Sequence, residues 1–312
     1  MPGVDLVLNP HARRLRPGSA RRRIVVDEAG REGVRIHEPT TLAELEEVAR
    51  GCALRGVRVV LVAGGDGTLM RCLSALVGAF EPASLPLVGI VPAGTVDTVS
   101  RNLGVARARI RTIVRAACSV TATGSPQSTL CVRDGAEAGR IGFIFGAGLV
   151  SQFFDLYHRS RRPGLATAAI IAARVFTSSL VGTSLAARVL APAACVLSVD
   201  GLRREETGWS LVVASVVCDL GLHFRVTYRA RSDGPCFHVV ASGLSPYELG
   251  RQMPRVLAGR PLRGQPHVDA LATSLRLDFK APGAAYVLDG DVFQASSLTV
   301  ETGPAVRMLR IG

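Results

Sequence analysis

A valine-rich run that stops at a glycine cluster constrains this chain more than any other stretch. Val59 to Ala63 is apolar and β-branched, with the length of a buried parallel strand. From Leu69 to Leu76 the apolar residues recur near helical spacing. The segment Gly64-Gly65-Asp66-Gly67-Thr68 therefore lies where a strand ends and a helix begins. Backbone N–H groups and the positive end of a helix dipole gather at such a junction, which predicts a phosphate-binding turn.

The residue types within this turn suggest separate tasks. Gly64, Gly65 and Gly67 lack Cβ atoms, so a polyphosphate can lie directly against the backbone. Asp66 would repel phosphate, and we expect it to hold Mg²⁺ or waters on that ion, with Thr68 donating to a phosphate oxygen. The alternative is an ordinary tight turn between a strand and a helix.

A second turn of similar composition follows the next expected strand. Leu85 to Val91 reads as a strand and leads into Pro92-Ala93-Gly94-Thr95, after which a helix is expected. Earlier in the chain, Val4 to Leu8 reads as a strand ended by Asn9-Pro10. Strands that alternate with helices predict a parallel, doubly wound sheet, in which ligands bind beyond the carboxyl ends of the strands. Both Gly-Thr turns would lie on that edge and could face one nucleotide.

The helix between the first strands has a recognisable start. Val34 to His37 is a candidate strand, and Thr40 and Thr41 follow it. Glu44 stands three residues after Thr41, which predicts a capping box for a helix that runs toward Leu54.

From about Leu130 the pattern changes to closely spaced strands, which predicts a mostly antiparallel β domain. A helical, Ala-rich segment from Leu165 to about Leu190 interrupts it; Arg174 and Arg188 count against a membrane span there. A core-packed helix is the favoured role, and an interfacial surface that helps extract lipid is the alternative. The expected strands are Leu130–Val132, Ile141–Phe145, Cys195–Val199, Ser210–Val217, Phe224–Tyr228, Phe237–Ala241, Ser274–Phe279, Ala285–Leu288 and Ser297–Glu301.

The amino-acid composition limits the classes of binding partner and the cellular compartment that we expect. The 312 residues suffice for two domains, and the net charge of +12 suits phosphates or an anionic membrane. Lys280 is the only lysine, so compositional bias toward arginine explains the charge equally well. Aromatic residues are 5% and no nucleic-acid motif is present, so no nucleic-acid partner is expected. The seven cysteines and six histidines show no metal-ligand spacing, and no signal peptide is expected, which indicates reduced thiols in a cytoplasmic protein.

Taken together, these motifs resemble the lipid kinase family that includes diacylglycerol, sphingosine and ceramide kinases. Their order and spacing cover essentially the whole chain. The residues that carry the resemblance are Asn9-Pro10, Thr40, Gly64 to Thr68, Pro92-Ala93-Gly94-Thr95, Ser232-Asp233-Gly234 and Leu288-Asp289-Gly290-Asp291.

The resemblance implies an ATP-dependent, Mg²⁺-assisted kinase with its active site in a cleft between two domains. It implies a nucleotide-binding α/β domain over residues 1–125 and a β-rich lipid-substrate domain over residues 126–312, whose last strand can return to the first domain. Asp291 lies where the family carries a glutamate that removes the proton from the lipid hydroxyl, Asp289 is a helper or turn residue, and Asp233 belongs to a turn linked to metal. The implied ATP-site residues are Asn9, Thr40, Gly64, Gly65, Asp66, Gly67, Thr68 and Thr95.

Several positions depart from the family pattern. Asp97 stands where the family usually has asparagine, and Asp291 is one methylene shorter than the usual glutamate. Met70-Arg71 replaces an Asn-Glu pair, and His11-Ala12 replaces Ser-Gly. The stretch Gly146-Ala147-Gly148-Leu149-Val150 lacks an acid that many relatives carry after it. These changes indicate a divergent branch.

Three functions remain open at this point. The leading one is a lipid kinase that acts on a diacylglycerol-like or sphingoid lipid and contacts the inner membrane face peripherally. The second is a catalytically weak relative that binds nucleotide or lipid without turnover. The third is an NAD kinase, which shares the Gly-Gly-Asp-Gly turn; the Pro92 to Thr95 turn and the terminal Asp-Gly-Asp fit it less well. A homodimer is also left open.

Overall fold

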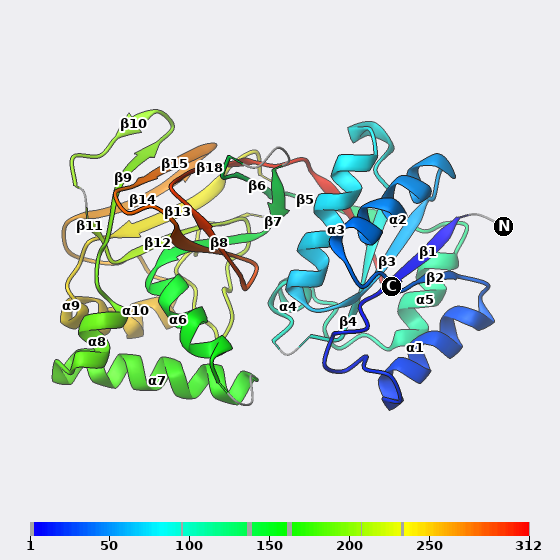
Figure 1. Ribbon diagram of the computed structural model, residues 1–312, viewed down its shortest axis with the longest axis horizontal. Helices are drawn as coiled ribbons and strands as arrows, with labels where there is room; N and C mark the ends of the chain where they lie inside the picture. The colour runs from blue at the N-terminus through cyan, green and yellow to red at the C-terminus, as the bar shows by residue number, and fades with distance from the viewer. Residues whose placement is uncertain are drawn as a thin grey trace. The chain divides into compact units, whose positions relative to one another are not determined.

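The computed structural model describes residues 3–94, 96–135, 139–160, 164–206, 208–231 and 234–311. The chain divides into two compact units. The first unit comprises Met1–Gln127 together with Pro304–Gly312, and the second unit comprises Ser128–Gly303. The chain therefore leaves the first unit after residue 127 and returns to it for its last residues (Figure 1).

The first unit is built on a mostly parallel sheet in the order β2-β1-β3-β4-β19-β5. Neighbouring strands run parallel from β2 through β19, and β5 is an antiparallel edge strand. Its strands are β1 (Val4–Leu8), β2 (Arg35–His37), β3 (Val59–Gly64), β4 (Leu87–Pro92), β5 (Gly124–Gln127) and β19 (Val306–Leu309). Its helices are α1 (Ala20–Arg31), α2 (Leu42–Leu54), α3 (Asp66–Ala79), α4 (Thr98–Asn102), α5 (Ile110–Cys118) and the 3₁₀ turn η1 (Pro82–Ser84).

Helices cover both faces of this sheet because its central strands are apolar on both sides. On one face, residues of β1 and β3 such as Leu6 and Leu61 pack with Val25 of α1 and Ile113 of α5. Helices α2 and α3 pack against each other, and α3 contacts β3 (Figure 1). The turns that follow the parallel strands lie at the carboxyl ends of these strands.

The second unit contains two antiparallel sheets. One has the order β10-β9-β15-β18-β6-β7 with β11 paired to β9, and the other has the order β14-β13-β12-β8-β16-β17. The strands of the first sheet are β6 (Leu130–Arg133), β7 (Arg140–Gly142), β9 (Ala193–Val199), β10 (Leu202–Arg203), β11 (Gly208–Trp209), β15 (Ser274–Phe279) and β18 (Ser297–Thr302). Those of the second are β8 (Ile144–Gly148), β12 (Leu211–Ser215), β13 (Phe237–Ser242), β14 (His267–Ala272), β16 (Ala284–Leu288) and β17 (Asp291–Ala295).

Helices pack on the second of these sheets. Leu149 at the start of α6 packs against buried residues of β12 and β13, and α7 contacts α6, α8 and α9. Among the described residues, no helix has both the length and the apolar character needed to cross a membrane. The helices are α6 (Leu149–His158), α7 (Leu165–Val181), α8 (Ser184–Val189), α9 (Pro246–Arg251) and α10 (Met253–Leu257). The predicted fold class, an α/β doubly wound domain plus a mostly antiparallel β domain, is confirmed.

Four local predictions were wrong in detail. The single strand expected over 141–145 is split at Phe143 into β7 and β8, which belong to different sheets. The split follows from hydrogen bonding, because the amides of Phe143 and Ile144 donate to the Asp289 carboxylate. The helical segment expected to run to about Leu190 is broken at Gly182, whose φ of 76° ends α7 in the left-handed region.

The third error concerns residues 224–228, which form no strand. Leu222 and His223 both have positive φ, 54° and 61°, and the Phe224 amide donates to the carbonyl of Gly221 in a tight turn. The capping box at α2 also differs. Thr41 accepts from the Glu44 amide at 3.2 Å, but the Glu44 carboxylate accepts from the Thr40 amide at 2.7 Å.

Candidate active site

The turn between β3 and α3 is joined to the end of β1. Gly64 ends β3, Gly65 is the N-cap of α3, and Asp66 is the first residue of that helix. Asn9 follows β1 directly, and its side-chain amide donates to Thr68 Oγ1 at 2.8 Å. A hydroxyl that accepts one hydrogen bond can still donate its own proton to a second group. The structure thus brings Asn9 and Thr68 together, with the Thr68 proton available to an acceptor such as a phosphate oxygen.

The Asp66 carboxylate ties this turn to the one that follows β4. Its two oxygens accept from the backbone amides of Thr98, at 2.7 Å, and Val99, at 3.1 Å. These amides open α4, whose own N-cap residue Asp97 makes no side-chain capping bond to the helix. Asp66 therefore caps a helix from a distance of 32 residues in sequence. Sequence reasoning assigned this carboxylate to magnesium and did not foresee the capping role.

Asp97 adopts a left-handed backbone conformation with φ of 53°, and its carboxylate accepts from the Gly94 amide at 2.8 Å. This conformation suits asparagine and aspartate better than most residues, since their short polar side chains bond locally. The departure from the family's asparagine is therefore compatible with the same turn. It adds a negative charge, which a basic side chain approaches, with Arg14 Nη1 lying 3.8 Å from Asp97 Oδ2.

Two glycines allow the two turns to touch. A Cβ atom on Gly94 would lie 2.6 Å from the Cα of Gly65, and one on Gly65 would lie 3.0 Å from the Cα of Gly94. Both distances are shorter than ordinary van der Waals contact. The absence of side chains at these positions is thus required by the fold of the first unit. This adds a structural reason to the predicted one, which was close approach of a phosphate.

The pKa values of both carboxyl groups are raised. Burial raises the pKa of Asp66 to about 6, against the opposing effect of the amides of Thr98 and Val99. Burial likewise raises the pKa of Asp97. Because the folded pKa of Asp66 exceeds its usual 3.8, the contribution of this group to stability falls as the pH rises from about 4 to about 6. Two neighbouring carboxyl groups with raised pKa values, Asp66 and Asp97, favour a site that binds a positively charged group.

Basic side chains reach the second turn from the segment after β1. Arg21 donates from its guanidinium to the carbonyl of Pro92, and Arg14 approaches Asp97. Sequence reasoning did not identify these two contacts. The signal was the arginine cluster that follows Asn9-Pro10, but its individual partners could not be deduced.

Three further predicted site residues, and one in the second unit, are less informative. Thr40 is exposed, and its hydroxyl donates to the Glu44 carboxylate at 3.0 Å. Gly67 lies in the first turn of α3. Thr95 and Asp233 lie outside the described residues, so their predicted roles have no structural account.

In the second unit, the terminal Asp-Gly-Asp motif forms a β-hairpin. Leu288 of β16 pairs with Asp291 of β17, and the two residues between them, Asp289 and Gly290, have φ of 48° and 91°. Positive φ at both central residues is the signature of a type I′ turn. The Asp289 carboxylate accepts from the Phe143 and Ile144 amides, so Asp289 holds the hairpin against the start of β8. Asp291, as the first residue of β17, is the remaining acid of the motif.

Comparison with known proteins identifies the first unit. Residues 4–128 match the family model of the diacylglycerol kinase catalytic domain, an interval that begins at β1 and ends at the boundary between the units. The match covers 125 of the 312 residues, about 40% of the chain. The paired turns after β3 and β4 thus lie within this catalytic domain.

Individual relatives are more distant. Over 81 residues the chain is 31% identical to a diacylglycerol kinase of Bacillus subtilis (strain 168), a stretch that covers 26% of this chain and only 25% of that protein. A solved structure of a Bacillus anthracis str. Sterne protein named as a diacylglycerol kinase covers 96% of this chain and 94% of its own, with a TM-score of 0.71 at 16% identity. A second, also from Bacillus anthracis str. Sterne and named as a diacylglycerol kinase, covers 98% and 97%, with a TM-score of 0.68 at 15% identity. At such identities the likeness establishes the fold alone.

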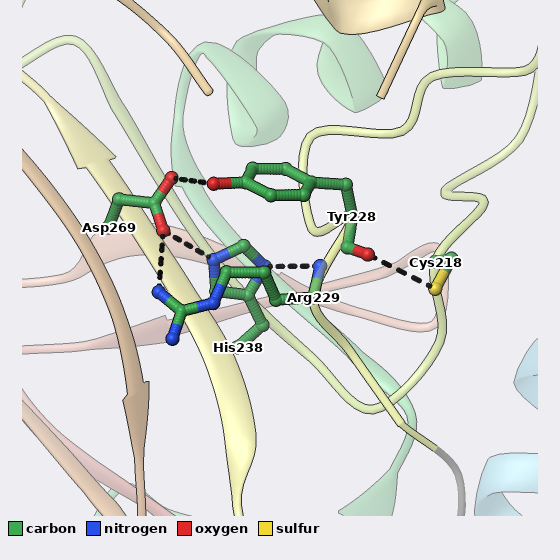
Figure 2. A network of polar contacts seen from close by, with 5 residues as sticks. All are labelled: Cys218, Tyr228, Arg229, His238 and Asp269. Atoms are coloured by element: carbon green, nitrogen blue, oxygen red, sulfur yellow. Dashed lines mark hydrogen bonds and ion pairs between the residues drawn. The ribbon is translucent and has the colours of Figure 1, made fainter. Parts of the chain in front are cut away.

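A buried polar network in the second unit has the residue types of a catalytic dyad. Fully buried His238 lies 2.9 Å from Asp269 Oδ1 through Nε2, and its Nδ1 accepts from the Arg229 amide at 3.2 Å (Figure 2). Tyr228 donates its hydroxyl proton to Asp269 at 2.9 Å. Because the Arg229 amide donates to Nδ1, the imidazole is left with no basic nitrogen to act as a general base. The network fixes the loop between β12 and β13 rather than performing chemistry.

This network should contribute to stability in a pH-dependent way. Burial opposes ionisation of Asp269, but hydrogen bonds from His238 and Tyr228 outweigh it and hold the pKa of Asp269 below its usual 3.8. We expect Asp269→Asn to cost about 1–3 kcal/mol of unfolding free energy at neutral pH, since charged hydrogen bonds are lost in a buried site. A folded pKa below the unfolded one means that this difference shrinks as the pH falls below 3.8. Urea unfolding of both proteins at neutral and acid pH measures it, and an equal difference at both would contradict this account.

The contact between the turns of the catalytic domain can be tested with alanine. Gly94→Ala should destabilise the protein by about 1–3 kcal/mol, because its Cβ meets backbone atoms that cannot give way. Gly78→Ala is the matched control, since a Cβ there meets nothing within 4 Å and α3 gains up to about 1 kcal/mol in helix propensity. Denaturant midpoints of the two variants give the comparison. A Gly94→Ala protein as stable as the parent would show that the turns are loosely packed.

Proposed function

We propose that this chain is an ATP-dependent lipid kinase that transfers the γ-phosphate to a hydroxyl of a diacylglycerol-like or sphingoid lipid. One observation carries the proposal. In a domain of the diacylglycerol kinase catalytic family, the Asp66 carboxylate joins the two turns at the carboxyl ends of β3 and β4. That edge of a parallel sheet is where ligands bind in doubly wound folds.

The residues of these turns fit a nucleotide polyphosphate with Mg²⁺. Helix α3 has 14 residues, and its N-cap Gly65 has no side chain to cap the first amides, which favours an anion at that end. Arg14 and Arg21 bring positive charge to the second turn. Asn9, Thr68 and Asp66 supply the oxygen and amide groups that would orient phosphates and hold the ion or its waters. Mg²⁺, when bound, offsets the negative charge of the phosphates.

The chain's own residues would divide the remaining work. Asp291 accepts the proton of the lipid hydroxyl as that oxygen attacks, in the position where the family carries a glutamate. Asp289 positions the hairpin through the Phe143 and Ile144 amides. The Thr68 hydroxyl, oriented by Asn9, donates to a phosphate oxygen.

A second candidate is a relative that binds nucleotide without turnover. The observation that favours it is Asp97, which adds a carboxylate to the second turn in contact with the Gly94 amide. Met70, in place of the family's asparagine, is buried in α3 and offers no polar group to the site.

One assay separates these functions. Purified protein is incubated with γ-labelled ATP, Mg²⁺ and diacylglycerol, sphingosine, ceramide or NAD. Label in a lipid product supports the proposal, and label in NADP overturns it in favour of an NAD kinase. ATP binding with no labelled product across the panel favours the second candidate.

Access to a lipid substrate would come through peripheral membrane contact, which is part of the proposal. Helix α7 contains no acidic residue, and Ile170 and Val181 are 59% and 79% exposed on it. Exposed Arg174 lies one turn from Ile170, so this side of the helix offers apolar groups and a positive charge to an anionic bilayer.

Vesicle co-sedimentation tests this contact. We expect Ile170→Glu to weaken binding to anionic vesicles, because it places a carboxylate against the negative surface. Leu54→Glu makes the same change at an apolar side chain of α2 that is 90% exposed, and it should leave binding unchanged. Equal sedimentation of the Ile170→Glu variant and the parent would remove α7 from the proposal.

A further inference from the structure

Three metal-ligating side chains of the first unit converge away from the paired turns. Asp5 of β1, His37 of β2 and Cys52 of α2 are brought together because β1 pairs with β2 and α2 packs over Asp5. His37 Nε2 lies 2.7 Å from Asp5 Oδ2, and Cys52 Sγ lies 3.4 Å from the same oxygen. One ligand atom from each residue falls within 4.8 Å of the other two, and the structure shows no other such group of three in the parts of the chain it describes.

The ligand set and its spacing suit zinc. A carboxylate oxygen, an imidazole nitrogen and a thiolate sulfur are the three ligand types that Zn²⁺ takes from proteins. With metal–ligand distances of about 2.0–2.3 Å in a tetrahedron, the ligand atoms of one ion lie roughly 3.3–3.7 Å apart. The Sγ–Oδ2 distance of 3.4 Å already matches, and the Nε2–Oδ2 distance of 2.7 Å has to widen by about 0.6 Å.

We propose that Asp5, His37 and Cys52 form a zinc site, with water as the fourth ligand. Asp5 and Cys52 are buried, at 3% and 0% exposure, while the His37 side chain is 19% exposed and marks the entry side. Asp5 lies four residues before Asn9, or about 13 Å along an extended strand, so the site is separate from the nucleotide turns. It would link β1, β2 and α2.

Arg55 competes with the metal. Its Nη2 atom lies 2.5 Å from the same Asp5 oxygen, and the arginine neutralises the buried carboxylate when no metal is bound. Arg35 lies opposite Asp5 in the strand register and adds a second positive charge to the neighbourhood. The Arg55 side chain is 37% exposed, so it can turn into solvent when a cation enters. Binding also releases the Cys52 thiol proton to solvent, leaving a neutral set of one Zn²⁺, one carboxylate, one thiolate and one imidazole.

Cobalt substitution provides the test, using the metal ion alone as the probe. Co²⁺ titrated into the apoprotein should give a thiolate-to-cobalt charge-transfer band at one equivalent, and added Zn²⁺ should abolish it. Cys52→Ser and His37→Gln should lose the band, while Cys72→Ser, which removes a buried thiol of α3 outside the cluster, should keep it. Circular dichroism confirms that each variant is folded.

Removal of the competing Arg55 provides a second test, in which metal affinity should increase. Arg55→Leu should bind Co²⁺ and Zn²⁺ about 10- to 100-fold more tightly, because the metal no longer displaces a charged hydrogen bond. One equivalent of Zn²⁺ should also raise the melting temperature of the parent and leave that of His37→Gln unchanged. A parent protein without the thiolate band, or a band that survives Cys52→Ser, overturns the proposal. Neither result bears on lipid kinase activity.

Discussion

Replacing Asp291 with asparagine is expected to lower lipid phosphorylation by about 10²–10⁴-fold, the usual contribution of a general base. Asparagine has nearly the same size but cannot accept the proton of the lipid hydroxyl. The substitution removes none of the residues proposed to bind ATP, so ATP affinity should stay unchanged. Single-turnover transfer from labelled ATP measures the chemical step, and binding of a non-hydrolysable ATP analogue measures affinity.

Asp289→Asn is the matched control two residues away. The Asp289 carboxylate accepts from the Phe143 and Ile144 amides, so its loss should destabilise the hairpin and lower the unfolding free energy by about 1–3 kcal/mol. Activity should then fall in step with the folded fraction, and excess stabilising osmolyte should restore part of it. Asp291→Asn should not respond to osmolyte. If instead Asp291→Asn retains full transfer, the proton acceptor is another group and the assignment of Asp291 fails.

The fold could be predicted from sequence because its strong signals are local. The alternation of Val-rich strands and helices in the first unit leaves few topologies, and the type I′ turn at Asp289-Gly290 carries its own conformational signature. One of the errors, the division of the strand expected over residues 141–145, arose where a distant group decides the backbone. Phe143 separates β7 from β8 because its amide donates a hydrogen bond to the Asp289 carboxylate, far along the chain.

The sequence predicted which residues form the candidate site, but it did not predict which partners these residues contact. Gly64 to Thr68 was found because a strand, three glycines and an acid stand together in the sequence. That Asp66 caps α4, and that Arg14 and Arg21 reach the second turn, depends on how β3 and β4 bring separate turns side by side. Sequence spacing could not predict the cluster of Asp5, His37 and Cys52, because its members lie on two strands and a helix.

Asp66→Ala is expected to weaken binding of an ATP analogue by at least about 10- to 100-fold in the presence of Mg²⁺. Loss of the carboxylate leaves the Thr98 and Val99 amides without their acceptor, and an unpaired buried donor costs about 1–3 kcal/mol. Loss of the negative charge also removes the group proposed to hold the ion or its waters. The measurement is affinity by titration calorimetry with and without Mg²⁺.

The magnesium dependence separates the two roles of Asp66. If Asp66 only caps α4, the variant binds the analogue more weakly but Mg²⁺ improves its affinity by the same factor as in the parent protein. If Asp66 also holds the ion, Mg²⁺ strengthens binding to the parent far more than to Asp66→Ala, because binding of the ion and of the nucleotide is then coupled through this carboxylate. Glu248→Ala serves as the control, since it removes an exposed carboxylate that caps α9 and contacts none of the residues proposed to bind ATP. Equal enhancement by Mg²⁺ in the parent and in Asp66→Ala would leave Asp66 with the capping role alone and assign the ion to other groups.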